Sequence, residues 1–194
     1  MNFLAHAFLS FNNPEIMVGN FIGDFVKGSN IHHLPAEIQK GVTLHRKIDS
    51  YTDKHETFKK SVFRISSEYG KYRFVIADMF YDHFLAKNWD KFHETELLNY
   101  TEEVYETLYS FSEYLPDDFI FALKYMKNGN WLYNYQHLEK IEQYLGGITR
   151  RSKYADALEK SIYDLKGDYT EFENDFNIFL PQVISYSKNE INIS

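Results

Sequence analysis

The stretch GVTLHRKIDSYTD, residues 41–53, decides the fold because a helical pattern there places charged side chains among apolar ones. At about 100° per residue, one stripe of the predicted helix carries Val42, His45 and Asp49. A histidine and a carboxylate four residues apart therefore face inward beside aliphatic neighbours. Burying a charge is costly unless it is paired or bound to a metal. The stretch thus indicates a core helix whose inner face also carries chemistry.

Helix signals also run through the rest of the chain. Its nine glycines and four prolines fall where helices would begin or end, as at Asn13 and Pro14, an N-cap followed by a first-turn proline. Alternation of period two bounded by turns is nearly absent. We predict helices near residues 2–11, 15–27, 35–51, 54–68, 71–88, 94–112, 117–128, 130–145, 152–165 and 168–187.

The domain organisation follows from length and composition. The 194 residues show no repeat, linker or low-complexity tract, so we predict one domain over residues 1–190 and a frayed tail at 191–194. Aromatic residues make up 18% of the chain, mostly 16 Tyr and 17 Phe, so large rings should fill the core. The predicted fold class is all-α, a single-domain multi-helix bundle.

Composition also limits the function. The chain has no cysteine, so disulfides and thiol nucleophiles are excluded, and any metal must be held by histidines and carboxylates. A net charge of −7 argues against nucleic-acid binding. The apolar start MNFLAHAFLSF is too short to span a membrane and lacks the basic residues of a signal peptide. We therefore predict a cytoplasmic protein that binds neither nucleic acid nor membrane.

Inward-facing histidines and aspartates recur in other predicted helices. In FVIADMFYDHFL, residues 74–85, His83 lies in the middle of the apolar face and Asp82 borders it. His6 is the only ionisable side chain of the apolar first helix, and Asp24 lies among apolar residues of MVGNFIGDFVKG. Neutral imidazole and carboxylate together suit Mn²⁺, Mg²⁺ or Fe²⁺. The pattern indicates a metal site, although a single buried histidine more often bonds a backbone carbonyl.

Basic residues offer a second kind of binding feature. Residues 40–73 hold nine basic and four acidic residues, whereas residues 90–118 hold nine acidic residues and one lysine. The basic segment could receive an anionic partner or a phosphate, or it could be a solvated helix face. Arginine forks suit phosphate, so Arg151 in ITRRS is a further candidate, with a plain surface role equally open.

Five motifs carry a family resemblance: MNFLAH, GNFIGDFVKG, GVTLHRKIDSYTD, DHFLAKNW and WLYNY…LGGITRR. In this order and spacing they resemble the bacterial acyl carrier protein (ACP) phosphodiesterase family, also called ACP hydrolases. The resemblance covers essentially the whole chain and is densest in residues 1–90. It implies a divergent HD-domain-like helical fold and dependence on a divalent cation, typically Mn²⁺. It also implies removal of the 4′-phosphopantetheine arm from holo-ACP by phosphodiester hydrolysis.

The resemblance also suggests site residues. The aspartate of the family's GN-x3-DF motif corresponds to Asp24, for which we expect a catalytic role together with Asp49 and Arg46. We expect Asp49 to orient His45 or to complete the ligand set, and Lys47 and Arg151 to bind substrate phosphate. The metal ligands are expected to be a subset of His6, Asp24, His45, Asp82 and His83.

Two features of the sequence leave alternatives open. The doublet at 82–83 is Asp-His, the reverse of the pair that names HD domains, so either member could bind metal. An HD-like phosphohydrolase acting on a nucleotide or another small phosphoester is one rival function. A metal-free helical adaptor is the other, with Asp49 simply paired with Arg46 or Lys47 and the inward histidines forming a structural network.

Overall fold

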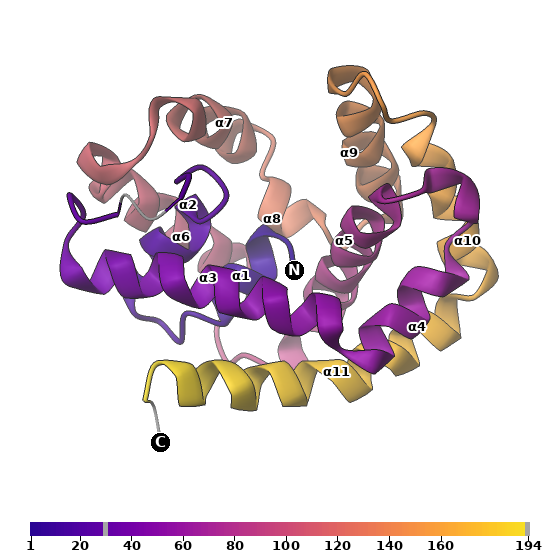
Figure 1. Cartoon of the computed structure of the whole chain (residues 1–194), viewed down its shortest axis with the longest axis horizontal. Helices are drawn as coiled ribbons and strands as arrows, with labels where there is room; N and C mark the ends of the chain where they lie inside the picture. Colours follow the sequence, from indigo (N-terminus) through magenta and orange to yellow (C-terminus); the bar gives the residue numbers. More distant parts are fainter. Residues whose placement is uncertain (29–30, 193–194) are drawn as a thin grey trace.

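The computed structural model describes residues 1–28 and 31–192, and within them every regular element is a helix (Figure 1). The all-α prediction is confirmed. Of the predicted frayed tail, residues 193–194 lie outside the described residues, and Ile191 and Asn192 form a turn. The α-helices are α1 (Phe3–Phe8), α2 (Pro14–Ile22), α3 (Ala36–Lys54), α4 (Glu56–Arg64), α5 (Tyr72–Lys87), α6 (Leu97–Ser110), α7 (Asp117–Asn128), α8 (Trp131–Asn134), α9 (Leu138–Arg151), α10 (Ile162–Gly167) and α11 (Tyr169–Glu190).

Helices α2 and α3 touch backbone to backbone because glycines face each other at their crossing. A Cβ atom on Gly19 would lie 2.1 Å from the carbonyl oxygen of Ile38, and one on Gly41 would lie 2.2 Å from that of Ile16. Neither clash can be relieved by turning a side chain, because the obstructing atoms are backbone. The two helices are therefore held at a fixed separation just before the residues that form the candidate site.

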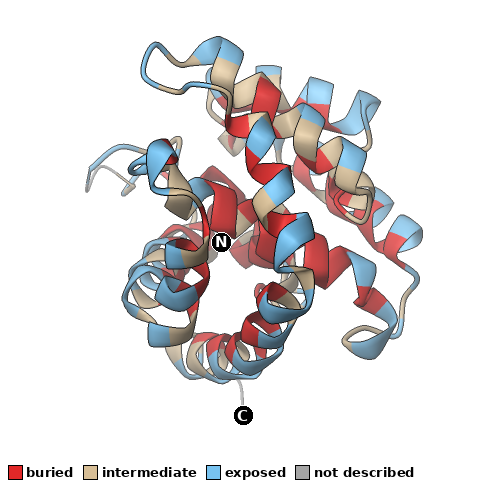
Figure 2. Ribbon diagram, turned by 90° about the vertical axis from the view of Figure 1, so that its right-hand side faces the viewer, coloured by how far each residue is buried: buried red, intermediate tan, exposed pale blue. Residues whose placement is uncertain are grey.

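Large aromatic side chains fill the core, as the composition predicts. The largest fully buried side chains include Trp89, Tyr81 and Phe58, and the ring of Tyr81 meets that of Phe58 edge-on at a centroid distance of 5.2 Å. Buried residues lie where helices face one another and exposed residues lie outside (Figure 2). The long helix α11 runs beside α3 and α4 (Figure 1). No helix within the described residues is long and apolar enough to cross a bilayer.

The helix predictions are wrong in the region 130–165. The predicted helix 130–145 is two helices, α8 and α9, separated by a turn that ends with the extended backbone of His137. Gly146 lies inside α9 rather than ending it, and the 3₁₀ helix Leu158–Ser161 packs against α9. The predicted helix 152–165 is irregular at first, and Ala157 has a left-handed backbone with φ 49°, which α-helices exclude.

Candidate active site and metal centre

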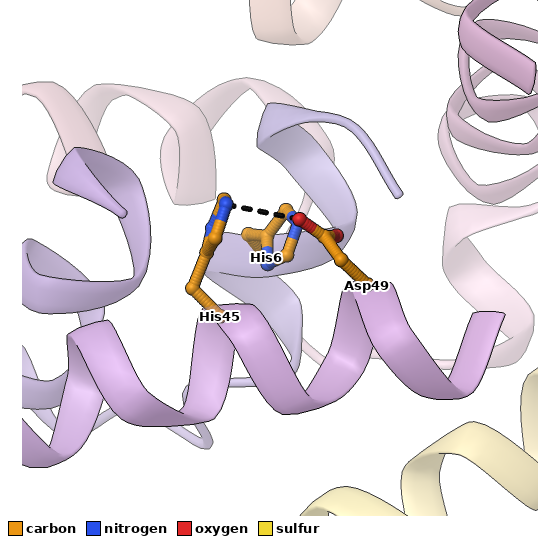
Figure 3. Close-up of side chains that lie close together, drawn as sticks. All are labelled: His6, His45 and Asp49. Carbon is orange, nitrogen blue, oxygen red and sulfur yellow. Dashed lines mark ion pairs between the residues drawn. The ribbon is translucent and has the colours of Figure 1, made fainter. Parts of the chain in front are cut away.

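Three side chains from two helices converge at the candidate site, which we call the His–Asp cluster: His6 from α1, and His45 and Asp49 from α3 (Figure 3). Each offers one ligand atom, and these atoms all lie within 4.8 Å of one another. The two imidazole rings stack with centroids 4.2 Å apart. The spacing of four along α3 places His45 and Asp49 on one face, and the docking of α1 adds His6.

His6 is buried and neutral. Its Nδ1 lies 2.7 Å from the side-chain oxygen of Asn20, and its Nε2 lies 3.2 Å from Oδ1 of Asp49. Burial, reinforced by the nearby His45, lowers the pKa of His6 to about 4, and the attraction of Asp49 does not offset this. A neutral imidazole keeps the lone pair that a metal ligand needs.

His45 has the opposite electrostatics because two carboxylates face it. Its Nε2 lies 3.1 Å from Oδ2 of Asp49 and 3.2 Å from Oδ1 of Asp24, while its Nδ1 lies 2.7 Å from the main-chain oxygen of Asn20. Burial lowers the pKa of His45, but the hydrogen bonds to Asp24 and Asp49 outweigh it and raise the pKa to about 9. Burial likewise opposes ionisation of Asp49, yet its contact with His45 and the nearby His6 and N-terminal amino group hold its pKa well below the usual range. The cluster therefore favours a positive charge at its centre.

Two atoms of the cluster lack a hydrogen-bond partner. Nε2 of His6 and Oδ1 of Asp49 are buried and make no hydrogen bond to the described residues, although they lie 3.2 Å apart and Oδ1 also lies 3.6 Å from the N-terminal amino group of Met1. A buried polar atom without a partner costs free energy. A cation between them would satisfy both, and imidazole nitrogen with carboxylate oxygen is a donor set for divalent first-row metals. The residues present therefore fit a divalent cation.

Beside the cluster lies a hollow of about 580 Å³, which we call the site hollow; it is lined by Gly23, Asp24, Val26, Gly28, His45, Arg46 and Asp49. The side chain of Asp24 is 76% exposed, so a substrate can reach it. The hydrogen bond from His45 lowers the pKa of Asp24 and keeps it ionised. Arg46 donates from Nη2 to the Val26 carbonyl at 2.9 Å, which ties the loop after α2 to α3.

Gly23 makes room for the imidazole of His45. Its backbone is ordinary right-handed helix, with φ −51° and ψ −40°, so no conformational reason requires glycine. A Cβ atom at this position would lie 2.2 Å from Cγ of His45 and 2.4 Å from Cδ2. Space for the ring is therefore what excludes a side chain at residue 23.

The other predicted phosphate-binding residues lie elsewhere. Lys47 forms an ion pair with Glu190 of α11 and lines a second hollow of about 440 Å³, between α3 and the end of α11. Arg151 donates from Nε to the carbonyl of Gly147 in its own helix at 3.1 Å. Of the three basic residues suggested by the sequence, the structure brings Arg46 to the site hollow.

Asp82 and His83 are buried but have other partners. Asp82 accepts hydrogen bonds from the backbone N–H groups of Leu4 and Ala5, at 2.8 and 3.3 Å, and so caps α1. Nδ1 of His83 donates to the Tyr135 carbonyl at 2.9 Å, and its Nε2 accepts from the Tyr169 hydroxyl at 2.8 Å. Burial raises the pKa of Asp82 to about 7 and lowers that of His83 to about 4. The structure does not bring these two residues to the His–Asp cluster.

Comparison with known proteins gives a family that covers nearly the whole chain. The family model for acyl carrier protein phosphodiesterase matches residues 1–183. The chain belongs to this family. Proteins named acyl carrier protein phosphodiesterase from Photorhabdus laumondii and from Escherichia coli O139:H28 are each 30% identical to it. These alignments cover 98% of this chain and 96% and 99% of the two relatives. No solved structure matches, so the HD-domain likeness stays a prediction.

Sequence reasoning missed Asn20, which contacts both histidines of this family member. Its Nδ2 donates to the His6 carbonyl at 2.8 Å and to Oγ of Ser10 at 3.1 Å. The signal was present in GNFIGDF, where an amide stands four residues before Asp24 among apolar neighbours. A buried amide needs partners on both of its polar ends, which marks such a position as part of a network.

Proposed function

We propose that this protein hydrolyses the phosphodiester of holo-acyl carrier protein, releasing 4′-phosphopantetheine and leaving apo-ACP. The family match over residues 1–183 carries the proposal, together with relatives whose names state this activity. The His–Asp cluster beside an open hollow supplies residues suited to phosphodiester chemistry.

We infer that a divalent cation is held by His6, His45 and Asp49, and that Mn²⁺ is the natural choice, with Mg²⁺ and Fe²⁺ as alternatives. Such a cation supplies two things in phosphoester hydrolysis: it lowers the pKa of water and it neutralises phosphate charge. The support for this set is that two buried atoms that face each other, Nε2 of His6 and Oδ1 of Asp49, make no hydrogen bond. Asp82 and His83 are left out because their ring and carboxylate atoms bond elsewhere.

The chain's own residues have separate tasks in this reaction. Asp24 is ionised and exposed, so it can accept a hydrogen bond from the attacking water and orient it. Arg46 uses one N–H on the Val26 carbonyl, and its guanidinium carries further donors that can hold phosphate oxygens beside the cluster. The water oxygen bonds to phosphorus, and the bond from phosphorus to the serine oxygen of the carrier protein breaks. The water gives up one proton and the serine oxygen takes one up, so no proton is gained or lost overall.

The partner in this proposal is holo-ACP, an acidic protein according to the family resemblance, and the location is the cytoplasm. The net charge of −7 opposes encounter with an acidic partner, so local basic residues must offset it. Within segment 40–73, Lys40 pairs with Glu37 and Lys47 with Glu190, whereas Arg46 lines the site hollow. The absence of cysteine is in keeping with a reducing compartment.

Mass spectrometry of holo-ACP incubated with the protein and Mn²⁺ tests the proposal. We expect the carrier to lose the mass of the phosphopantetheine group, and Asp24→Ala to abolish the loss. Asp53→Ala is the matched control, because Asp53 is an exposed carboxylate on α3 that does not line the site hollow. Intact holo-ACP after incubation with folded, Mn²⁺-loaded protein would rule out this substrate and direct attention to small phosphoesters.

A further inference from the structure

Asn20 lies in α2 between the two histidines of the cluster and is completely buried. Its side chain bonds His6 on one helix, and its main-chain carbonyl bonds His45 on another. For one residue to bond both histidines, its side chain must point to one helix and its main-chain carbonyl to another. The close crossing of α2 with α3 at Gly19 and Gly41 brings the backbone of α2 near enough.

The hydrogen-bond network fixes the orientation of the amide. The carbonyl of His6 can only accept, so the group 2.8 Å away must be the NH₂ of Asn20, and its Oδ1 must face Nδ1 of His6. An amide oxygen has no proton to give, so Nδ1 of His6 carries the proton in that 2.7 Å contact. In neutral His6 the lone pair then belongs to Nε2, the atom that faces Asp49.

The same reasoning applies to His45 through the backbone. Its Nδ1 lies 2.7 Å from the main-chain oxygen of Asn20, which is also an acceptor only. Nδ1 of His45 therefore carries a proton, and Nε2 is the atom left to face Asp24 and Asp49. Asn20 thus turns the Nε2 edge of both imidazole rings toward the centre of the cluster.

We propose that Asn20 is a positioning residue: its side chain sets the tautomer of His6, and its main-chain carbonyl holds Nδ1–H of His45, so that both rings turn Nε2 toward the cluster. The role it serves at the cluster rests on the proposed metal site, since outer partners of this kind orient ligating histidines. The tautomers themselves can be measured without metal or substrate. The two halves of the proposal also separate cleanly, because substitution of residue 20 removes its side chain and leaves its carbonyl.

Nitrogen NMR of histidine-labelled, metal-free protein near neutral pH provides the first test. In the wild-type chain we expect His6 to show a protonated Nδ1 and an unprotonated Nε2. In Asn20→Leu, which has a similar shape and no polar atoms, the His6 preference should be lost while Nδ1 of His45 stays protonated. Asn20→Asp keeps an acceptor opposite Nδ1 of His6 but loses the donor to the His6 carbonyl, so Nδ1 of His6 should stay protonated. A wild-type spectrum with the proton on Nε2 of His6 overturns the proposal without any variant.

Calorimetric titration with MnCl₂ tests the consequence for binding. We expect Asn20→Leu to bind Mn²⁺ on the order of 10–100-fold more weakly than wild type. A folded Asn20→Leu variant with unchanged His6 tautomer and unchanged affinity would show that another contact orients the ring. If the wild-type chain shows the expected tautomers but binds no Mn²⁺, the metal site fails while the positioning role of Asn20 in the network stands.

Discussion

Replacing Gly23 by alanine should disable the site by displacing one imidazole. The added Cβ would lie 2.2 Å from Cγ of His45, where ordinary contact begins near 3.4 Å. The ring, or the whole of α2, must therefore move by about 1 Å. His45 has little freedom to give way, because both of its nitrogens are bonded, to the Asn20 carbonyl on one side and to Asp24 and Asp49 on the other.

The expected size of the effect follows from that displacement. Catalytic groups must be held within about 0.5 Å of their productive positions, and a shift of about 1 Å costs on the order of 100-fold in rate. Overpacking a tight interior costs typically 1–3 kcal/mol of stability. Residue 23 lies just past the end of α2, so the better helix propensity of alanine offsets little of this. We therefore expect a folded protein with modestly lowered stability and kcat/KM lower by about two orders of magnitude.

The assay is carrier-protein cleavage followed by mass spectrometry, with denaturant unfolding in parallel. Gly147→Ala is the matched control: it lies inside α9, and its Cβ would meet Nη2 of Arg150 at 3.8 Å, an ordinary contact. The control should keep full activity and unfold at the same or slightly higher denaturant concentration. A Gly23→Ala protein with the parent's kcat/KM would refute the steric argument, because the ring would have moved without consequence or not at all.

Four further outcomes are expected. Burial keeps His83 neutral in the fold, so between its ordinary pKa of 6.5 and its folded pKa of about 4 the unfolded chain binds more protons than the folded one. The free energy of unfolding should therefore decrease by roughly 3 kcal/mol as the pH is lowered from 6.5 to about 4. Denaturant curves of wild type and His83→Gln at several pH values check this, and parallel pH slopes would contradict it. Mn²⁺ at about 100 times its Kd should add about 2.7 kcal/mol to the free energy of unfolding, and this gain should be lost with EDTA or in Asp49→Asn. A melting temperature that changes neither with EDTA nor in Asp49→Asn would contradict the proposed metal site. Arg46→Lys keeps the positive charge but loses the paired N–H donors of the guanidinium, so kcat/KM for holo-ACP should fall about tenfold in steady-state assays. An unchanged kcat/KM would exclude a contact between Arg46 and the substrate phosphate. Raising salt should slow cleavage of holo-ACP, and rates insensitive to ionic strength would count against docking through the basic segment 40–73.

The inward direction of His45 and Asp49 could be predicted from sequence because it depends on helical period alone. The same period also predicted that Asp82 and His83 face inward, and both are buried. What they face could not be predicted, because it depends on which helix docks there. Asp82 meets the start of α1, where free backbone N–H groups need acceptors, and this partner lies 77 to 78 residues away in the chain.

Other properties of the site depend on distances of a few ångströms between helices. The sequence shows a glycine at position 23, but only the packed structure shows that it leaves space for the ring of His45. The turn at His137 was missed because residues 130–145 contain no glycine or proline to mark it, and the extended backbone of His137 is visible only in the structure. Exposed side chains such as Arg151 carry no periodic signal that separates a phosphate contact from a helix end.

The dependence of the site on α1 has a consequence for how the protein opens. Two of the three cluster residues belong to the 19-residue helix α3, but His6 belongs to a helix of six residues, too short to be stable alone. That helix is held by the carboxylate of Asp82 and by its packing on α2 and α5. Local unfolding of the first turn would leave a two-donor half-site on a rigid support. An ion that binds all three donors would then hold the N-terminal segment against α3. Protection of α1 from proteases and from hydrogen exchange would therefore report how fully the metal site is occupied.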